Sequence, residues 1–216
     1  MDLARARQNM VWGQLRPNRI TDPRLLAAMA EVPRERFLPA ALRAVAYADE
    51  DLELGDGRRL IEPLALAKML QAAAVRPEDT ALVIGRDVGY AAAVLARLAT
   101  TVFLLVEREE EAEHTDRLLN DIGAENVVVR SGDPRRGLPE LAPFDVILLT
   151  GAVPEVPRTL LGQLQDGGRL VAVVTDNGAG RVEVWQRVGD SFGRRAPFDA
   201  WIPPCPAFQP EAGFRF

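Results

Sequence analysis

The sequence is poor in the side chains that many enzymes use as nucleophiles, bases and metal ligands. Its 216 residues include one cysteine, Cys205, and one histidine, His114. A single cysteine excludes an internal disulfide and a zinc site built from several thiolates, and it is consistent with a reducing compartment. His114 follows the acidic run Glu109-Glu110-Glu111-Ala-Glu113, which predicts an exposed helix surface. We therefore expect neither a histidine-based catalytic triad nor a metal centre.

Long apolar runs and an excess of basic residues are also lacking. No segment approaches the roughly 18 apolar residues of a membrane span, and the first residues contain no apolar signal core. We expect a soluble, cytoplasmic protein that does not bind membranes. The net charge is −5 and the arginines are scattered, so the basic face typical of nucleic-acid-binding proteins is absent too. Hydrophobic residues, at 48%, are numerous enough for one compact core.

The first third of the chain is predicted to be helical. Helices are expected at Arg24–Glu31 and Leu64–Ala74, on either side of an irregular stretch, Asp49–Ile61. The first helix follows Thr21-Asp22-Pro23, in which a capping side chain precedes a proline in the first turn. We expect one domain over 1–216, with a helical N-terminal region at 1–75 and a core at 76–216.

The core region alternates between short apolar runs and helical segments. Strands are predicted at 80–84, 102–106, 126–130, 144–150 and 169–174, and helices at 90–99, 109–122 and 157–164. Continuous apolar runs are typical of parallel strands covered on both faces, and right-handed crossovers then give a doubly wound α/β sheet. Residues 181–188 alternate and are predicted to pair antiparallel. The proline-rich ending is expected to be irregular, with Trp201 and Phe208 as packing residues.

A candidate ligand site follows three of the predicted strands. The first strand leads into Gly85-Arg-Asp-Val-Gly89, a tight turn of the kind at which an α/β sheet binds nucleotide-like ligands. Glu107, at the end of the second strand, can accept both hydroxyls of a ribose, and Asp133, after the third, can accept an adenine amino group. The alternative is that the glycines serve the turn alone and Glu107 is an ordinary acid at a helix start. NAD is disfavoured because G-x-G-x-x-G is absent.

Several segments resemble the protein-L-isoaspartate O-methyltransferases, a family of class I S-adenosylmethionine (SAM) methyltransferases. They follow the family's order over about residues 5–175 and are Val32-Pro-Arg-Glu-Arg-Phe37, Ala46-Tyr47, Gly89-Tyr-Ala-Ala-Ala-Val-Leu-Ala96, Val106-Glu107, Gly132-Asp133, Ala142-Pro-Phe-Asp145 and Leu160-Leu-Gly-Gln-Leu-Gln-Asp-Gly-Gly-Arg-Leu170. The resemblance implies a Rossmann-like, mostly parallel seven-stranded sheet with an N-terminal helical extension. It also implies SAM as cofactor and the isoaspartyl carboxylates of damaged proteins as substrates. The implied cofactor residues are Gly85, Asp87, Gly89, Tyr90, Glu107 and Asp133.

This reaction makes modest demands on side chains. The substrate carboxylate is itself the nucleophile and the sulfonium is an excellent leaving group, so the enzyme mainly aligns the two and excludes water. No general base is needed. The lack of a histidine or cysteine constellation is therefore no argument against this activity.

The cofactor turn departs from the family pattern, which resembles Leu-Glu-Ile-Gly-Thr-Gly-Ser-Gly-Tyr. Val83 replaces the acid and removes a partner of the methionine ammonium. A hydrogen bond to a charged group contributes about 1.5–3 kcal/mol, or roughly 10- to 100-fold in affinity. Arg86, Asp87 and Val88 replace the threonine, the central glycine and the serine. One hypothesis is that Asp87 binds the ammonium of the cofactor and Arg86 its carboxylate.

The substrate loop departs as well. The family pattern resembles Gly-Gln-Thr-Ile-Ser-Gln-Pro, whereas this chain has Gly57-Arg58-Arg59-Leu60-Ile61-Glu62-Pro63. The hydroxyl that the family places beside the transferring methyl is replaced by Ile61, which cannot hydrogen-bond the substrate. The candidate substrate residues are Arg59, Leu60, Ile61 and Glu62. Arg58 or Arg59 anchors an acidic substrate in one interpretation and is simply solvated in the other.

Two altered motifs leave three functions open. The resemblance implies isoaspartyl methyl transfer, and the altered motifs predict that this activity is weak, altered or lost. The first alternative is a non-catalytic binding module that keeps the fold and ignores SAM. The second is a SAM methyltransferase for a different acidic or small-molecule substrate. SAM binding and the labelling of an isoaspartyl peptide distinguish the three.

Overall fold

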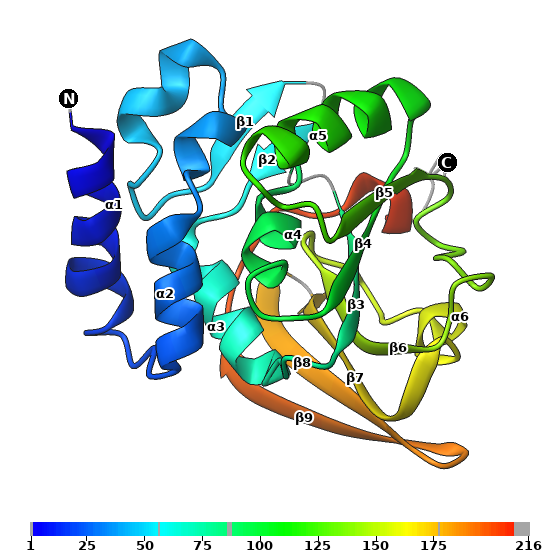
Figure 1. The fold of residues 1–216 in the computed structure, drawn as a ribbon. Coiled ribbons are helices and arrows are strands. Elements are labelled where there is room, and N and C mark those ends of the chain that lie inside the picture. Colours follow the sequence, from blue (N-terminus) through cyan, green and yellow to red (C-terminus); the bar gives the residue numbers. More distant parts are fainter. Residues whose placement is uncertain (1, 56, 86–87, 177, 210–216) are drawn as a thin grey trace, which may run out of the picture.

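A seven-stranded mixed sheet forms the centre of the computed structural model, which describes residues 2–55, 57–85, 88–176 and 178–209 (Figure 1). Its strand order is β5-β4-β3-β6-β7-β8-β9. The bounds are β3 Thr80–Ile84, β4 Thr101–Val106, β5 Val127–Ser131, β6 Phe144–Leu149, β7 Leu164–Asp176, β8 Ala179–Val188 and β9 Ser191–Asp199. The neighbouring strands from β5 to β7 pair parallel, whereas β8 pairs antiparallel with both β7 and β9. The predicted doubly wound, mostly parallel α/β sheet is confirmed.

Helices pack on both sides of this sheet, with α1 to α4 on one side and α6 on the other in Figure 1. Their bounds are α1 Leu3–Met10, α2 Pro23–Glu31, α3 Pro63–Ala73, α4 Tyr90–Leu95, α5 Glu109–Asp121 and α6 Arg158–Leu161, with shorter helical turns η1 Val11–Leu15, η2 Arg34–Phe37, η3 Ala40–Val45 and η4 Pro206–Phe208. Alternate residues of β3 enter different hydrophobic clusters: Val83 packs with the N-terminal helices and Leu82 with α6. Burial on both faces explains the continuous apolar runs.

The start of α2 illustrates how the local sequence sets a boundary. The Asp22 carboxylate accepts hydrogen bonds from the backbone N–H groups of Arg24, at 2.8 Å, and Leu25, at 3.3 Å. Pro23 occupies the first turn, where its missing N–H costs nothing. The predicted helix is confirmed and begins one residue earlier.

Several boundaries differ from the predictions. The stretch expected to be irregular contains a hairpin of β1 (Leu52–Gly55) and β2 (Arg58–Leu60). α4 and α6 are shorter than predicted, and β7 begins at Leu164, where a helix was expected to end. β9 was not predicted at all. It is an exposed edge strand that contains Gly193 and Pro197, two residue types that are unfavourable in a central strand but tolerated at an edge.

The segment after β9 crosses the carboxyl ends of the parallel strands. The Ala152 N–H donates to the Pro203 carbonyl at 2.9 Å, and the Cys205 N–H donates to the Ala152 carbonyl at 2.8 Å. Ile202 and Cys205 are buried, but Trp201 is 53% exposed. The prediction that Trp201 is a packing residue is therefore wrong, whereas Phe208 does pack against the cluster around α6.

Two further findings concern membrane-spanning helices and metal sites. Across the described ranges, no helix has both the length and the apolar character needed to cross a membrane. Within the same ranges, no group of three or more histidine, cysteine, aspartate or glutamate side chains is arranged to hold a metal ion.

Candidate functional site

Gly85 directly follows the carboxyl end of β3 and lies beside Thr150, the residue after β6. Its φ of +152° favours glycine, and a Cβ at this position would lie 2.0 Å from the Thr150 hydroxyl oxygen. The Thr150 N–H donates to the Ile84 carbonyl at 2.9 Å, so the β6 backbone also continues alongside β3. Only a residue without a side chain fits between these two strand ends.

Gly89 closes the turn and caps α4. Its φ is +95°, and a Cβ would lie 2.8 Å from the Cγ2 methyl of Thr115. Val88, just before it, has a φ of +60°, which is unusual for a β-branched residue. Arg86 and Asp87 lie outside the described residues, so the hypothesis that they bind the amino acid portion of the cofactor stays a prediction.

Two carboxylates follow the neighbouring strands at the same edge. Glu107 comes directly after β4 and is exposed, and it forms no hydrogen bond or ion pair with any residue in the described ranges. Asp133 follows β5, and its Oδ1 accepts a hydrogen bond from the Arg135 N–H at 2.9 Å. β3, β4 and β5 are adjacent and parallel. Gly85, Glu107 and Asp133 are therefore brought to one edge of the sheet, as their spacing predicted.

Tyr90 is placed differently from the other predicted cofactor residues. Its side chain is fully buried, with its ring 5.5 Å from that of Phe37 and the Arg34 guanidinium 4.9 Å above it. Burial raises the pKa of the Tyr90 phenol to about 12, although the nearby Arg34 charge opposes this shift. The side chain thus packs under the N-terminal region, and only its backbone, in the first turn of α4, is close to the cofactor turn.

The residues at this edge fit the adenosine part of SAM. The exposed Glu107 carboxylate has both oxygens available for two ribose hydroxyls, and the Asp133 carboxylate retains acceptor capacity after its bond to Arg135. The bare Gly85 backbone allows close approach of a ligand. The contacts predicted for the methionine end of the cofactor involve Arg86 and Asp87, which lie outside the described residues.

The predicted substrate loop forms β2 and the turn into α3, and its residues have unequal environments. Leu60 is fully buried in the main hydrophobic cluster and is a packing residue. Ile61 is also buried, but together with Arg59 it lines a small crevice. The Arg59 guanidinium lies 3.4 Å from Glu53, across the hairpin.

Carboxylates surround the end of this loop. The Asp51 carboxylate accepts a hydrogen bond from the Glu62 N–H at 2.8 Å, and Asp49 accepts one from the Leu64 N–H at 3.2 Å. Burial, followed by the charges of Asp49 and Asp51, raises the pKa of the Glu62 carboxyl above its usual value. Burial also raises the pKa of Asp51, and its hydrogen bond from Glu62 partly opposes the shift.

At the crevice beside Ile61, the substrate loop meets the end of β6 and the C-terminal segment. The crevice holds only about 10 Å³ and is lined by Gly57, Arg59, Ile61, Thr150, Gly151 and Pro203 to Pro206. Thr150 and Gly151 were not predicted as site residues, although Thr150 ends a predicted strand and Gly151 directly follows it, so their position at the same end of the sheet was deducible. No local signal indicated that Pro203 to Pro206 return to this point.

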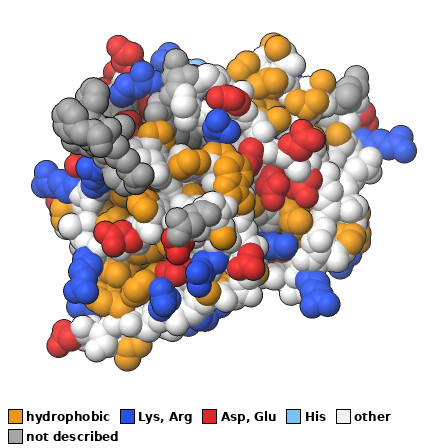
Figure 2. All heavy atoms as spheres, turned by 180° about the vertical axis from the view of Figure 1, so that it is seen from behind, with side chains coloured by type: hydrophobic (Ala, Val, Ile, Leu, Met, Phe, Trp, Pro, Cys, Tyr) orange, Lys and Arg blue, Asp and Glu red, His pale blue; other side chains and the backbone are white. Residues whose placement is uncertain are grey.

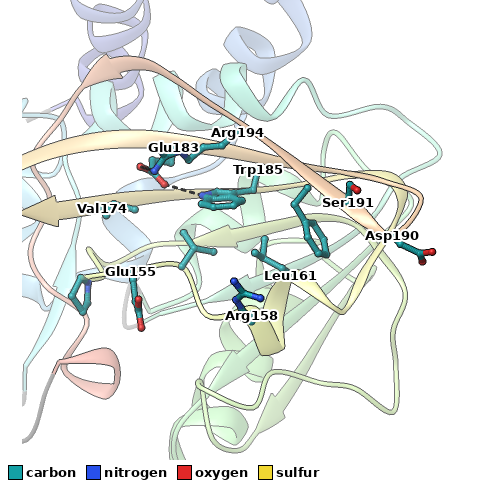
Figure 3. Close-up of a pocket in the computed structure, with 12 residues that line it drawn as sticks. Glu155, Arg158, Leu161, Val174, Glu183, Trp185, Asp190, Ser191 and Arg194 are labelled. Carbon is teal, nitrogen blue, oxygen red and sulfur yellow. Dashed lines mark hydrogen bonds and ion pairs between the residues drawn. The ribbon is translucent and has the colours of Figure 1, made fainter.

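A much larger cleft lies elsewhere, between α6 and the β8–β9 hairpin. It has a volume of about 820 Å³, and Figure 3 shows Trp185 and Leu161 facing its interior. The buried Glu183 carboxylate accepts a hydrogen bond from Trp185 Nε1 at 2.9 Å and pairs with Arg194 at 3.1 Å. No predicted site residue lines this cleft. The Glu183 and Arg194 charges neutralise each other, and size alone does not make this cleft the functional site.

The outer surface gives no better guide. Figure 2 shows acidic and basic side chains interleaved with hydrophobic surface over the face seen from behind. A site defined by one sign of charge is therefore not evident on the described part of that face, and the strand ends remain the best-defined candidate.

Comparison with known proteins decides the family. Residues 5–197 match the family described as protein-L-isoaspartate(D-aspartate) O-methyltransferase. This chain belongs to that family. Among its relatives, the protein-L-isoaspartate O-methyltransferase of Pelotomaculum thermopropionicum is 41% identical over 170 residues, covering 79% of this chain and 74% of the relative. That of a Synechococcus strain is 45% identical over 180 residues, covering 82% and 74%.

Solved structures agree with this assignment. A protein-L-isoaspartate O-methyltransferase superposes with a TM-score of 0.81 at 25% identity, covering 92% of this chain but 65% of the other. A putative family member from Plasmodium falciparum, in complex with S-adenosyl-L-homocysteine, gives a TM-score of 0.79 at 16% identity, covering 92% and 97%, which supports the fold.

The family acts on isoaspartyl residues with SAM as methyl donor, and the predicted resemblance is confirmed. Neither the matches nor the fold support a loss of activity or a pseudoenzyme. The altered motifs at positions 83–88 and 57–63 are real sequence differences, but nothing in the comparisons makes them a sign of degeneracy.

Proposed function

We propose that this chain transfers the methyl group of SAM to the α-carboxylate of isoaspartyl residues in proteins and peptides. The observation that carries the proposal is the shared edge at which Gly85, Glu107 and Asp133 follow three adjacent parallel strands. An exposed carboxylate beside a glycine turn can accept hydrogen bonds from the two hydroxyls of a ribose-bearing cofactor. Family membership supports the same activity.

Each site residue has a proposed role. Glu107 binds the ribose hydroxyls and Asp133 the adenine amino group. The backbone of Gly85, Gly89 and the first turn of α4 at Tyr90 forms the wall against the cofactor. Asp87 is proposed to meet the methionine ammonium in place of the acid that Val83 replaces.

When bound, SAM supplies an electrophilic methyl group on a sulfonium. An oxygen of the substrate carboxylate forms a bond to that methyl carbon as its bond to sulfur breaks, and a neutral thioether leaves, so no proton has to be moved. The chain therefore has to hold the carboxylate in line and keep water away. The crevice among Ile61, Thr150 and Gly151 lies where the substrate loop meets the end of β6, so these residues are proposed to flank the carboxylate. At about 10 Å³ it has room for roughly one water, so it must widen to admit the substrate.

Arg59 favours an acidic group in this crevice. Arg59 is one of the residues that line the crevice, and its guanidinium pairs only loosely, at 3.4 Å, with Glu53. We propose that it attracts the substrate carboxylate in the absence of the family's hydroxyl at position 61. The same observation favours a second candidate function, methylation of another acidic substrate.

The N-terminal helices pack against the sheet and are included in the proposed domain. They share one hydrophobic cluster with β3, β4 and β6. We propose that residues 1–216 act as one domain, in which the N-terminal region carries the substrate loop to the edge of the sheet.

A transfer assay tests the activity. The protein is incubated with methyl-labelled SAM and either a peptide with one isoaspartyl residue or its twin with normal aspartate. The proposal predicts a base-labile methyl ester on the isoaspartyl peptide only. SAM binding without label on either peptide would reject isoaspartyl activity and favour the second candidate, for which Arg59→Glu should abolish turnover of the true substrate.

A further inference from the structure

Arg34 is a fully buried arginine in the short helical turn η2. Its Nε donates to the Ala46 carbonyl at 2.7 Å, and its Nη2 donates to the Ile61 carbonyl at 2.7 Å. The guanidinium carbon lies 4.9 Å from the centre of the Tyr90 ring. One side chain therefore contacts three segments that are far apart in the sequence.

Two of these segments carry the proposed site. Ile61 lies in the substrate loop and lines the crevice, and Tyr90 opens α4 directly after the cofactor turn. Arg34 holds the backbone of the first and the ring of the second. Arg34 thus connects the substrate loop to the first turn of α4.

The chemistry of arginine suits this connection. A guanidinium is a rigid planar fork, so two donors directed at carbonyls of different segments fix the distance between those segments. Its flat face stacks on an aromatic ring at the same time. Lysine is a point charge on a flexible stem and cannot reproduce both bonds and the stack. Burying the charge is costly, which argues that this residue does more than fill space.

We propose that Arg34 is a positioning residue that fixes the substrate loop against the first turn of α4. Cofactor binding at the turn then orders the substrate loop through Arg34. This inference rests on the proposed function, because it assumes that a cofactor binds beside Gly89. Arg34 contacts no reacting atom in this account; it acts through the Ile61 backbone.

A buried arginine near the amino ends of the parallel strands, in β7, provides a matched control. Arg169 is 9% exposed and donates to the Ala73 and Ala74 carbonyls, and it pairs with Asp79. Arg34→Lys and Arg169→Lys each replace a buried fork by a point charge. Both variants should lose stability, but only the first touches the substrate loop.

The test is hydrogen exchange of backbone amides with and without S-adenosylhomocysteine, on the parent protein and both variants. In the parent and in Arg169→Lys, the ligand should slow exchange both in 88–95 and in 58–62. In Arg34→Lys, it should slow exchange in 88–95 but leave 58–62 within twofold of the ligand-free rate. Equal protection of 58–62 in Arg34→Lys and the parent overturns the proposal.

Kinetics provide a second readout. Arg34→Lys should lower kcat for the isoaspartyl peptide roughly tenfold or more, since small misplacements of the reacting groups are costly, while the Kd of S-adenosylhomocysteine changes less than threefold. An unchanged kcat, or an equal loss in Arg169→Lys, would contradict a positioning role. If the parent bound S-adenosylhomocysteine without methylating the peptide, the isoaspartyl activity would fail while the exchange test still decided the role of Arg34. If the parent bound no S-adenosylhomocysteine at all, the cofactor site and the coupling through Arg34 would both be rejected.

Discussion

The two sides of the candidate site are built in opposite ways. On the cofactor side, Glu107 and Asp133 are exposed carboxylates at the ends of β4 and β5. On the substrate side, Ile61, Thr150 and Gly151 are buried, and Pro203 to Pro206 close over them. The first side presents acceptors to solvent, whereas the second leaves a crevice of about 10 Å³.

This difference shows that local sequence determines one half of the site more than the other. Strand ends of a parallel sheet meet at one edge whatever the side chains are, so acceptors placed there need only correct spacing. The substrate side depends on packing among a hairpin, a strand end and a distant terminal segment. Changes on the cofactor side should therefore affect binding alone, and changes on the substrate side should affect stability and turnover together. The first prediction concerns Gly85, at the junction of the two sides.

Gly85→Ala should have the largest effect. The added Cβ would lie 2.0 Å from the Thr150 hydroxyl oxygen and 3.2 Å from the Thr150 backbone nitrogen, at a φ of +152°, so the Thr150 side chain or the strand ends around it must shift. We expect roughly 3 kcal/mol or more of lost stability and no detectable binding of S-adenosylhomocysteine, measured by urea denaturation and calorimetry. Gly13→Ala, which meets nothing within 4 Å, should change stability by less than about 0.5 kcal/mol. A stable, ligand-binding Gly85→Ala variant would contradict the close approach of the strands.

Glu107→Ala should weaken S-adenosylhomocysteine binding by roughly 10- to 100-fold, because about 1.5–3 kcal/mol is lost with hydrogen bonds to a charged group. The side chain is exposed and makes no contact that stabilises the described fold, so the melting temperature without ligand should not change. Glu110→Ala, on the exposed first turn of α5, is the control. Equal binding by both variants would remove Glu107 from the site.

Ile61→Ser should separate stability from turnover on the substrate side. Loss of a buried isoleucine should cost about 2–4 kcal/mol. The new hydroxyl should raise kcat/KM for the isoaspartyl peptide about tenfold relative to Ile61→Ala, which opens the same space without a hydrogen-bonding group. Identical kcat/KM values for the serine and alanine variants would show that the substrate carboxylate does not lie beside position 61.

Glu62→Gln should have the smallest effect, and its sign depends on pH. Burial and the charges of Asp49 and Asp51 raise the pKa of Glu62 in the folded state, so its ionised form destabilises the fold at neutral pH. The variant should be more stable by roughly 0.5 kcal/mol at pH 7. The advantage should vanish as the pH falls through the raised folded pKa toward about 4.3, its unfolded value. Glu50→Gln at an exposed position is the control, and a gain that persisted at pH 4 would contradict the charge argument.

The same contrast explains what could be predicted from the sequence. The runs at Thr80–Ile84 and Val102–Val106 are apolar on both faces, which predicts buried parallel strands, and the positions of Gly85 and Glu107 follow from them. β9 could not be predicted, because exposed polar residues with Gly193 and Pro197 give no periodic signal. The hydrogen bond between Ala152 and Pro203 joins segments far apart in the sequence, so it depends on tertiary packing alone. Burial of the Tyr90 side chain was missed for a related reason, since its partners Arg34 and Phe37 lie in the N-terminal region.

Calorimetric titration of the protein with S-adenosylhomocysteine decides whether the altered turn after β3 still builds a cofactor site. We expect saturable one-to-one binding with a micromolar Kd. No heat of binding at millimolar ligand, from a protein that remains folded, would contradict it and would leave the methyltransferase fold without a methyltransferase function.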